Sequence, residues 1–123
     1  MAGESATGTP PASALPAPVC PDFHHAVELI GRRWTGAIVF ALDGGPRRFH
    51  ELAECVTGVS DRLLSQRLRE LEIEGIVARS VTSEPALSVS YSLTEKGEGL
   101  RPALTELQAW ARGWKAERTS RSA

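Results

Sequence analysis

Four polar side chains recur at helical spacing in the middle of the chain: Arg62, Ser65, Gln66 and Arg69. Residues three and four apart are neighbours on a helix surface, so a helix here would present them together. In a DNA major groove, arginine can donate two hydrogen bonds to guanine and glutamine can pair with adenine. The residue types and their spacing therefore predict a surface that reads double-stranded DNA.

The segment that carries these residues has the signals of one capped helix. Ser60 stands where its hydroxyl can accept a hydrogen bond from the first turn, and helices commonly end at a glycine such as Gly75. Apolar residues at the spacing of one buried face are Leu64, Leu68 and Leu71. We therefore predict a helix over residues 60–74 that packs on its leucines and leaves the Arg/Gln/Ser face to solvent.

The flanking segments predict a winged helix-turn-helix. A short helix is expected over His50–Val56, and Thr57–Val59 is a glycine-containing turn between it and the next helix. Residues 76–81 and 88–93 alternate apolar and polar side chains, which predicts a β-hairpin placed directly after the reading helix. The expected fold class is α+β, mainly α, with the hairpin as the wing.

Further elements precede this unit. Asp22 is expected to cap a first helix that runs to Ile30, with residues 31–33 as a joint. Trp34–Leu42 is the most apolar segment and the expected centre of the core. Arg47–Phe49 is compatible with a short strand.

The last predicted helix begins at a Thr94 cap, and Pro102 should kink it or mark a fresh start. Its apolar stripe consists of Leu100, Leu104, Leu107, Trp110 and Trp114. Two exposed tryptophans would form an unusually large apolar patch on a monomer. The stripe is therefore predicted to be core or a seam between subunits.

Composition separates a central domain from two tails. Residues 1–19 are rich in Ala, Pro, Ser, Thr and Gly and are expected to be disordered. We predict one domain over residues 20–115 and a flexible tail over residues 116–123.

Positive charge is concentrated in the middle of the chain, although the net charge is only -1. Residues 31–69 carry seven arginines against four acidic residues, as expected for an electrostatic footprint on one face. Arg47 and Arg48 are candidates for phosphate contact, with solvated positions near helix ends as the alternative. Arg67 lies off the reading face and is expected to pair with an acid, whereas the glutamates at 70, 72 and 74 are expected to be solvated.

Membrane insertion and secretion are not indicated. The longest apolar run, Ala37–Leu42, is far shorter than the roughly 20 residues that cross a bilayer. The start of the chain lacks the basic and apolar regions of a signal peptide. We therefore expect a cytoplasmic protein with no membrane partner, in which the two cysteines are free thiols.

Catalytic and metal-binding motifs do not emerge from the sequence. There is no glycine-rich phosphate loop and no nucleophile-elbow motif. Cys20, His24 and His25 could offer two ligands from one helix, but structural zinc takes four. We expect no enzyme, metal or cofactor; a thiol oxidoreductase using Cys20 would lack a Cys-x-x-Cys pair.

Taken together, these segments resemble the HxlR family of winged-helix transcription regulators, which are related in shape to the MarR group. The resemblance covers about residues 20–115 and rests on Cys20-Pro21, Leu29–Trp34, Gly45–Leu52, Val59–Leu71, Glu74-Gly75 and Tyr91–Gly97. It implies a homodimer held by the terminal helices and a pseudo-palindromic operator. The expected dimerisation residues are Phe23, Val27, Leu100, Leu104, Leu107, Trp110 and Trp114.

The wing departs from the family pattern. Members commonly carry an arginine just before the second wing strand; here that residue is Ser88, so the wing is expected to contribute little to DNA binding or to act through its backbone.

The two thiols suggest an input to such a regulator. A cysteine at the position of Cys20 is typical of thiol-sensing members of the family, and some use a second one. Cys20 precedes the first helix, where the helix dipole and Arg32 or Arg33 would favour the thiolate. A disulfide from Cys20 to Cys55 of the other subunit would rotate the reading helices. The alternative is that both cysteines act as small hydrophobic residues with no redox role.

These observations predict a homodimeric, sequence-specific, DNA-binding transcription regulator, and we expect a repressor in preference to an activator. Its DNA-binding residues are expected to be Ser60, Arg62, Ser65, Gln66, Arg69, Arg48 and Arg47. Two alternatives stay open: a winged helix used for protein contact, and a regulator controlled by a small molecule instead of an oxidant.

Overall fold

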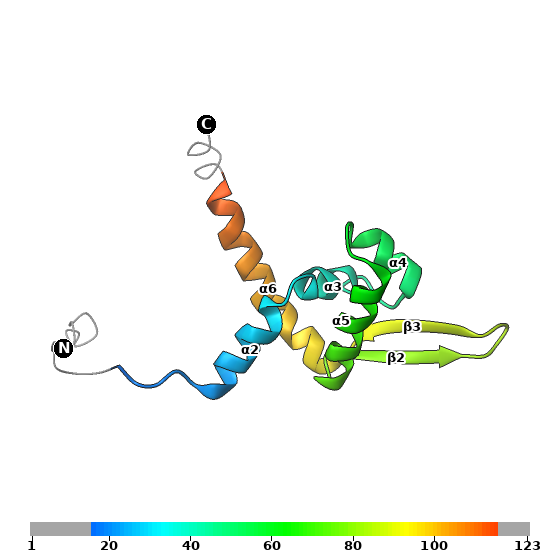
Figure 1. The fold of residues 1–123 in the computed structure, drawn as a ribbon, viewed down its shortest axis with the longest axis horizontal. Helices are drawn as coiled ribbons and strands as arrows, with labels where there is room; N and C mark the ends of the chain where they lie inside the picture. Colours follow the sequence, from blue (N-terminus) through cyan, green and yellow to red (C-terminus); the bar gives the residue numbers. More distant parts are fainter. Residues whose placement is uncertain (1–15, 116–123) are drawn as a thin grey trace.

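The computed structural model describes residues 16–115 (Figure 1). Its elements in chain order are α2 (Pro21–Gly31), α3 (Thr35–Ala41), β1 (Arg47–Arg48), α4 (Phe49–Cys55), α5 (Asp61–Ile73), β2 (Val77–Thr82), β3 (Ser88–Leu93) and α6 (Glu95–Gly113). The predicted tails over residues 1–19 and 116–123 lie mostly outside the described residues. No helix within 16–115 combines the length and apolar character needed to cross a membrane.

The sheet of the described residues has the strand order β1-β3-β2 with antiparallel pairing throughout. Tyr91 of β3 lies opposite Arg79 of β2 on one side and Arg47 of β1 on the other. The β2–β3 hairpin projects from the helical body, away from α2 and the free end of α6 (Figure 1). This arrangement is a winged helix-turn-helix, as the sequence predicts.

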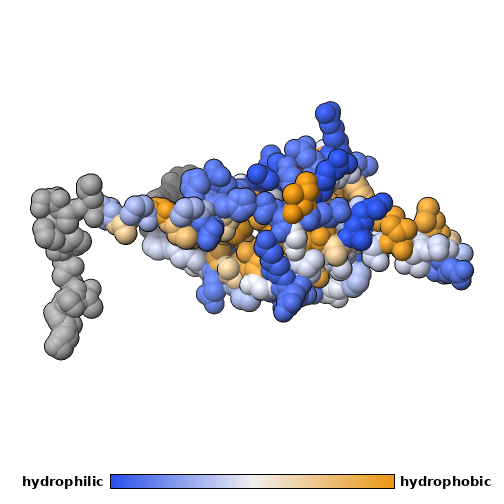
Figure 2. Space-filling view, turned by 90° about the horizontal axis from the view of Figure 1, so that it is seen from below, coloured by the Kyte–Doolittle hydropathy of each residue, from blue (hydrophilic) through white to orange (hydrophobic). Residues whose placement is uncertain are grey.

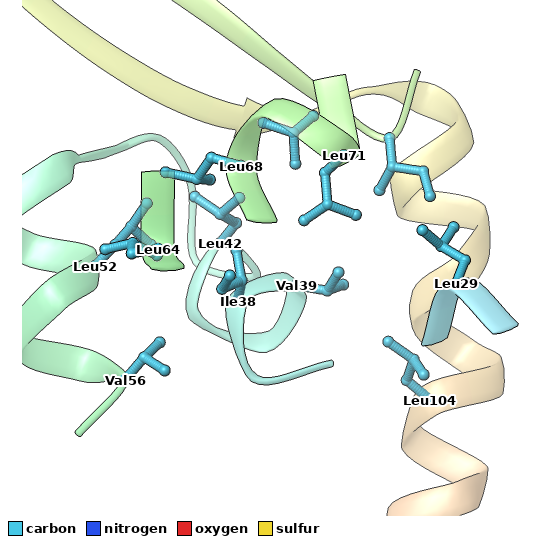
Figure 3. Close-up of a cluster of buried hydrophobic side chains, with 12 residues drawn as sticks. Leu29, Ile38, Val39, Leu42, Leu52, Val56, Leu64, Leu68, Leu71 and Leu104 are labelled. Atoms are coloured by element: carbon cyan, nitrogen blue, oxygen red, sulfur yellow. The ribbon is translucent and has the colours of Figure 1, made fainter. Parts of the chain in front are cut away.

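The hydrophobic core is centred on α3, whose side chains meet those of α4, α5 and α6 (Figure 3). Its most deeply buried members are Ile38, Val39, Leu42, Leu52, Leu64, Leu68 and Leu71. Burying a leucine or isoleucine side chain contributes about 1.5–3 kcal/mol relative to leaving it exposed. Packing through the leucines of α5 therefore fixes which face of that helix turns outward.

Side-chain caps begin two of the three helices for which the sequence predicts them, α5 and α6. The Leu63 amide donates to Ser60 Oγ at 3.1 Å, and the Gly97 amide donates to Thr94 Oγ1 at 3.1 Å. Thr94 Oγ1 also donates to the carbonyl of Gly75 at 2.5 Å, so the end of α5 is tied to the start of α6. Gly75 takes a φ of 78°, the left-handed conformation that suits a glycine after a helix.

Gly97 marks the closest approach of α6 to the segment after α5. A Cβ atom at this position would lie 2.3 Å from the carbonyl oxygen of Ile76. Glycine is therefore required here to let the two backbones meet.

The N-terminal helix boundaries differ from the prediction. α2 begins at Pro21, with Cys20 and not Asp22 at the N-cap and no side-chain cap. Proline suits this position because it has no N–H to leave unpaired. Trp34, predicted to begin α3, instead precedes it with a φ of 79°, inside a tight turn in which the Thr35 amide donates to the Arg32 carbonyl at 3.2 Å.

One further local prediction is wrong, and one of two alternatives given for Pro102 is excluded. Phe49 starts α4 instead of ending a strand, because only Arg47 and Arg48 pair with β3. α6 continues through Pro102 without a fresh start. The kink that the sequence offered as the other outcome at Pro102 stays a prediction, because a proline removes one backbone donor from the helix.

Candidate nucleic-acid interface

The polar face predicted from the sequence exists on α5. Arg62, Ser65, Gln66 and Arg69 are all exposed, and together they line a shallow hollow of about 280 Å³. Neither Arg62 nor Arg69 forms an ion pair within the described residues 16–115. Two guanidinium groups are therefore free to meet an external acceptor.

Arg67 belongs to a different environment on the same helix. Its Nη1 lies 3.2 Å from Glu70 Oε1, and its Nε donates to the carbonyl of Arg33 at 3.0 Å. This confirms the prediction that Arg67 pairs with an acid. The contacts also join α5 to the segment between α2 and α3.

Two glutamates at the end of α5 have partners within the chain, which the sequence did not predict. Glu70, expected to be solvated, contacts Arg67 and also Arg32, whose Nη1 lies 3.4 Å from Glu70 Oε1. Glu74 lies 3.0 Å from His25 Nε2 on α2. The hydrogen bond from His25 holds the pKa of Glu74 below its ordinary value, with smaller contributions from Lys96 and Arg32. Both predictions of a solvated carboxylate were therefore wrong, because α2 packs beside the end of α5.

This pairing also engages the histidines considered as metal ligands. His25 contacts Glu74, and His24 lies 3.4 Å from Glu28 one turn along α2. Within residues 16–115, no three His, Cys, Asp or Glu side chains are placed to hold a metal ion together.

The two arginines of β1 differ in their surroundings. Arg47 is half-buried, and its Nε donates to the carbonyl of Ala41 at 3.3 Å, so part of its guanidinium serves the end of α3. Arg48 is exposed, and its backbone amide donates to Glu51 Oε1 at 2.8 Å. That bond holds the pKa of Glu51 below its ordinary value. Of the two, Arg48 is thus the better placed for contact with a phosphate.

The wing presents an apolar tip. Leu87 is 76% exposed, and Ser88 at the start of β3 is half-buried. Together with residues of α4 and the start of α5, both line a hollow of about 480 Å³. Figure 2 shows hydrophobic groups on this hairpin, at the right of the view, next to white and blue residues at its outer end.

Both thiols are free and exposed in the described chain. Cys20 stands immediately before α2, as predicted, and occupies its N-cap in place of Asp22, but Arg32 lies at the opposite end of that helix. The 11 residues of α2 correspond to about 16 Å of helix, so Arg32 is not the neighbour of Cys20 that the sequence suggested. Cys55 is the last residue of α4, immediately before the turn into α5.

The terminal helices carry apolar side chains that the described chain leaves uncovered. Exposed fractions are 63% for Phe23, 50% for Val27, 52% for Leu107, 65% for Trp110 and 49% for Trp114. Leu104, by contrast, is buried in the core of the chain itself, and Leu100 is half-buried against it. The exposed stripe is therefore shorter than the predicted one and lies where α6 extends beyond the body (Figure 1).

Glu70 and the His25–Glu74 pair are the functional candidates that sequence reasoning missed. The spacing of Gln66 and Arg67 to Glu70 was a usable signal, because side chains three or four residues apart meet on a helix. No local pattern could have linked Arg32 or His25 to α5, because those contacts depend on tertiary packing.

Comparison with known proteins agrees with this architecture. Residues 29–119 match the family described as HxlR-like helix-turn-helix. The chain is 45% identical to the HTH-type transcriptional regulator YvaP of Bacillus subtilis, over 78% of this chain and 89% of that protein. It is 44% identical to the HTH-type transcriptional regulator YodB of the same organism, over 76% of this chain and 83% of YodB.

Comparison with solved structures also finds similarity to transcriptional regulators. The reduced form of YodB superposes with a TM-score of 0.73 at 42% identity, over 79% of this chain and 95% of that one. The redox regulator HypR in its reduced form superposes with a TM-score of 0.74 at 31% identity, over 80% of this chain and 98% of that one. YodB has also been solved after diamide treatment and with a bound quinone.

Proposed function

The chain belongs to the HxlR family of helix-turn-helix transcriptional regulators, and from this premise we propose that it is a homodimeric, sequence-specific repressor that senses oxidants. In this account α5 enters the major groove, and the helices α2 and α6 hold two subunits together. An oxidant acts through Cys20 and Cys55.

The observation that carries the DNA-binding part is the exposed polar face of α5, whose two arginines, Arg62 and Arg69, have no ion pair among residues 16–115. Arg62, Ser65, Gln66 and Arg69 are exposed side by side, while neighbouring Arg67 is engaged within the chain. A helix whose charged groups lack internal partners on one face is suited to base edges and phosphates. Ser60, Arg48 and the remaining N–H groups of Arg47 supply the proposed phosphate contacts beside it.

Dimerisation is supported by the uncovered apolar side chains of the terminal helices. Phe23 and Val27 on α2, and Leu107, Trp110 and Trp114 on α6, are each about half or more exposed, and exposed apolar side chains in such number mark an interaction site. In a two-fold dimer, the two α5 helices would lie about 34 Å apart and enter successive major grooves of a pseudo-palindromic operator.

Thiol sensing is supported by the exposure of both cysteines and by the relatives. Cys20 sits at the start of one dimerisation helix, and Cys55 ends the helix that precedes α5. We propose that an oxidant such as diamide takes two electrons and two protons from these thiols, leaving one disulfide between Cys20 and Cys55 of the partner subunit. That bond would change the spacing of the α5 helices.

The thiol step is tested by electrophoresis without reductant after diamide treatment. The proposal predicts a covalent dimer in the wild type and none in Cys20→Ser or Cys55→Ser. A wild-type band that stays monomeric, with both thiols still titratable, would contradict the intersubunit disulfide.

A small-molecule effector is the second candidate, and one observation favours it. A groove of about 440 Å³ lies between α2, α6 and the end of α5. Its walls are apolar and its rim includes His25, Glu74 and Lys96, a combination typical of ligand sites. Release of DNA by 1,4-benzoquinone that persists in the Cys20→Ser variant would favour this groove; release abolished in that variant would favour the thiol.

A further inference from the structure

Gln66 is the only uncharged amide on the proposed reading face, and a neighbour fixes its orientation. Gln66 Nε2 donates to Glu70 Oε2 at 3.3 Å, one helical turn further on. An ionised carboxylate can only accept hydrogen bonds. The amide must therefore turn its NH₂ group toward Glu70, so the end that carries Oε1 is defined as well.

Glu70 is itself held in place from outside α5. Arg67 contacts both of its carboxylate oxygens, at 3.2 and 3.3 Å, and Arg32 lies 3.4 Å away at the end of α2. Only 25% of the Glu70 side chain and 15% of the Arg67 side chain are exposed. The two guanidinium groups also neutralise a carboxylate that would otherwise repel a phosphate backbone.

We propose that Glu70 is a positioning residue that sets the base preference of Gln66; this rests on the proposed function, in which α5 reads DNA. Adenine offers an acceptor, N7, and a donor, the N6 amino group, in the major groove. With one N–H bonded to Glu70, Gln66 keeps one N–H for N7 and its carbonyl oxygen for the amino group. Glu70 contacts no base: it makes the presentation of the Gln66 amide unambiguous.

The test uses a DNA duplex that the full-length wild-type protein selects from a pool of random sequence. Anisotropy gives the ratio of affinities for this duplex and for random DNA. Glu70→Gln should lower that ratio by about fivefold or more, because a neutral amide at 70 can donate as well as accept and no longer orients Gln66. Glu72→Gln removes the same charge from the same helix, at a side chain with no ion pair among residues 16–115, and should leave the ratio unchanged.

A double mutant separates positioning from a general effect on the fold. In a Gln66→Ala background, Glu70→Gln should change the ratio no further, because the residue that it positions is gone. An equal loss with and without Gln66, or equal effects of Glu70→Gln and Glu72→Gln, would overturn the positioning role while leaving DNA recognition intact. Failure of the wild type to enrich any sequence would instead overturn the proposed function, and the positioning role with it.

Discussion

The three arginines of α5 differ in their partners: Arg67 is bonded within the chain, whereas Arg62 and Arg69 face solvent. This difference defines the proposed interface. The guanidinium of Arg67 donates hydrogen bonds to Glu70 and to the carbonyl of Arg33. Arg62 and Arg69 have no ion pair in the described part of the chain. An arginine whose hydrogen-bond partners lie inside the protein stabilises the fold and is not available to DNA. An exposed arginine without such partners is available to an external anion.

Substitution of the reading residues tests this distinction. Gln66→Ala and Arg69→Ala should each weaken binding to the selected DNA by about 1–3 kcal/mol, the usual range for a lost base contact. Fluorescence anisotropy with selected and random duplexes measures the effect. Arg112→Ala on the exposed end of α6 serves as the charge-matched control. If affinity for random DNA falls equally, these side chains touch only phosphates.

The His25–Glu74 contact predicts a defined dependence of stability on pH. The pKa of Glu74 lies below its ordinary value of 4.5, so the ionised carboxylate stabilises the folded state at pH above 4.5. That stabilisation is lost as the pH falls through the lowered pKa. The difference in melting temperature between wild type and Glu74→Gln should therefore be positive near neutrality and shrink as the pH falls below 4.5 toward the lowered pKa. A difference independent of pH would show that the carboxylate charge does not contribute.

At the scale of elements, the segments with strong local signals were predictable. The Ser60 cap and the leucine spacing predicted α5. The alternation of apolar and polar side chains predicted β3 with the bounds that the structure shows. The reading face followed from the same periodicity, because one buried face of a helix defines the opposite one.

Other features depend on contacts between distant segments and left no local trace. The left-handed Trp34 lies in the tight turn between α2 and α3, and Phe49 begins a helix because β1 pairs over only two residues. The same holds for the site: the bonds from Arg32 and His25 to α5 exist only after α2 has packed beside it.

The junction of α5, β2 and α6 offers a test of element packing. Gly97→Ala places a Cβ 2.3 Å from the Ile76 carbonyl oxygen and should lower the free energy of unfolding by about 1–3 kcal/mol. Gly99→Ala on the same helix meets nothing within 4 Å and should raise it by about 0.5–1 kcal/mol through helix propensity. Urea denaturation of both variants measures the difference. Equal effects would show that the close approach is not what constrains residue 97.

At the scale of the whole molecule, the wing and the free end of α6 project in different directions from one core (Figure 1). The polar face of α5 and the exposed apolar side chains of the terminal helices therefore have separate proposed partners, DNA and a second subunit. Ties from α2 to α5 at Glu70 and Glu74 connect the two surfaces. A change in the packing of α2 would therefore alter the contacts that hold the end of α5.

The proposed dimer seam is tested by placing a charge in it. Trp110→Glu should convert the dimer to a monomer, because an ionised carboxylate without a partner is costly to bury. Sedimentation velocity measures the change. Val81→Glu, on the exposed hairpin, should leave the assembly intact. A wild type that sediments as a monomer, or a Trp110→Glu variant that stays dimeric, would move the interface elsewhere.

The most direct test of the central claim is anisotropy of the reduced protein on DNA from its own upstream region and on random DNA, before and after diamide. The account predicts tight, specific binding that weakens steeply with added salt and changes on oxidation, with no change in the Cys20→Ser variant. Specific binding indifferent to diamide would contradict thiol sensing and direct attention to the groove beside α2. Absence of specific binding in either state would contradict the repressor assignment itself and favour a winged helix used for protein contact.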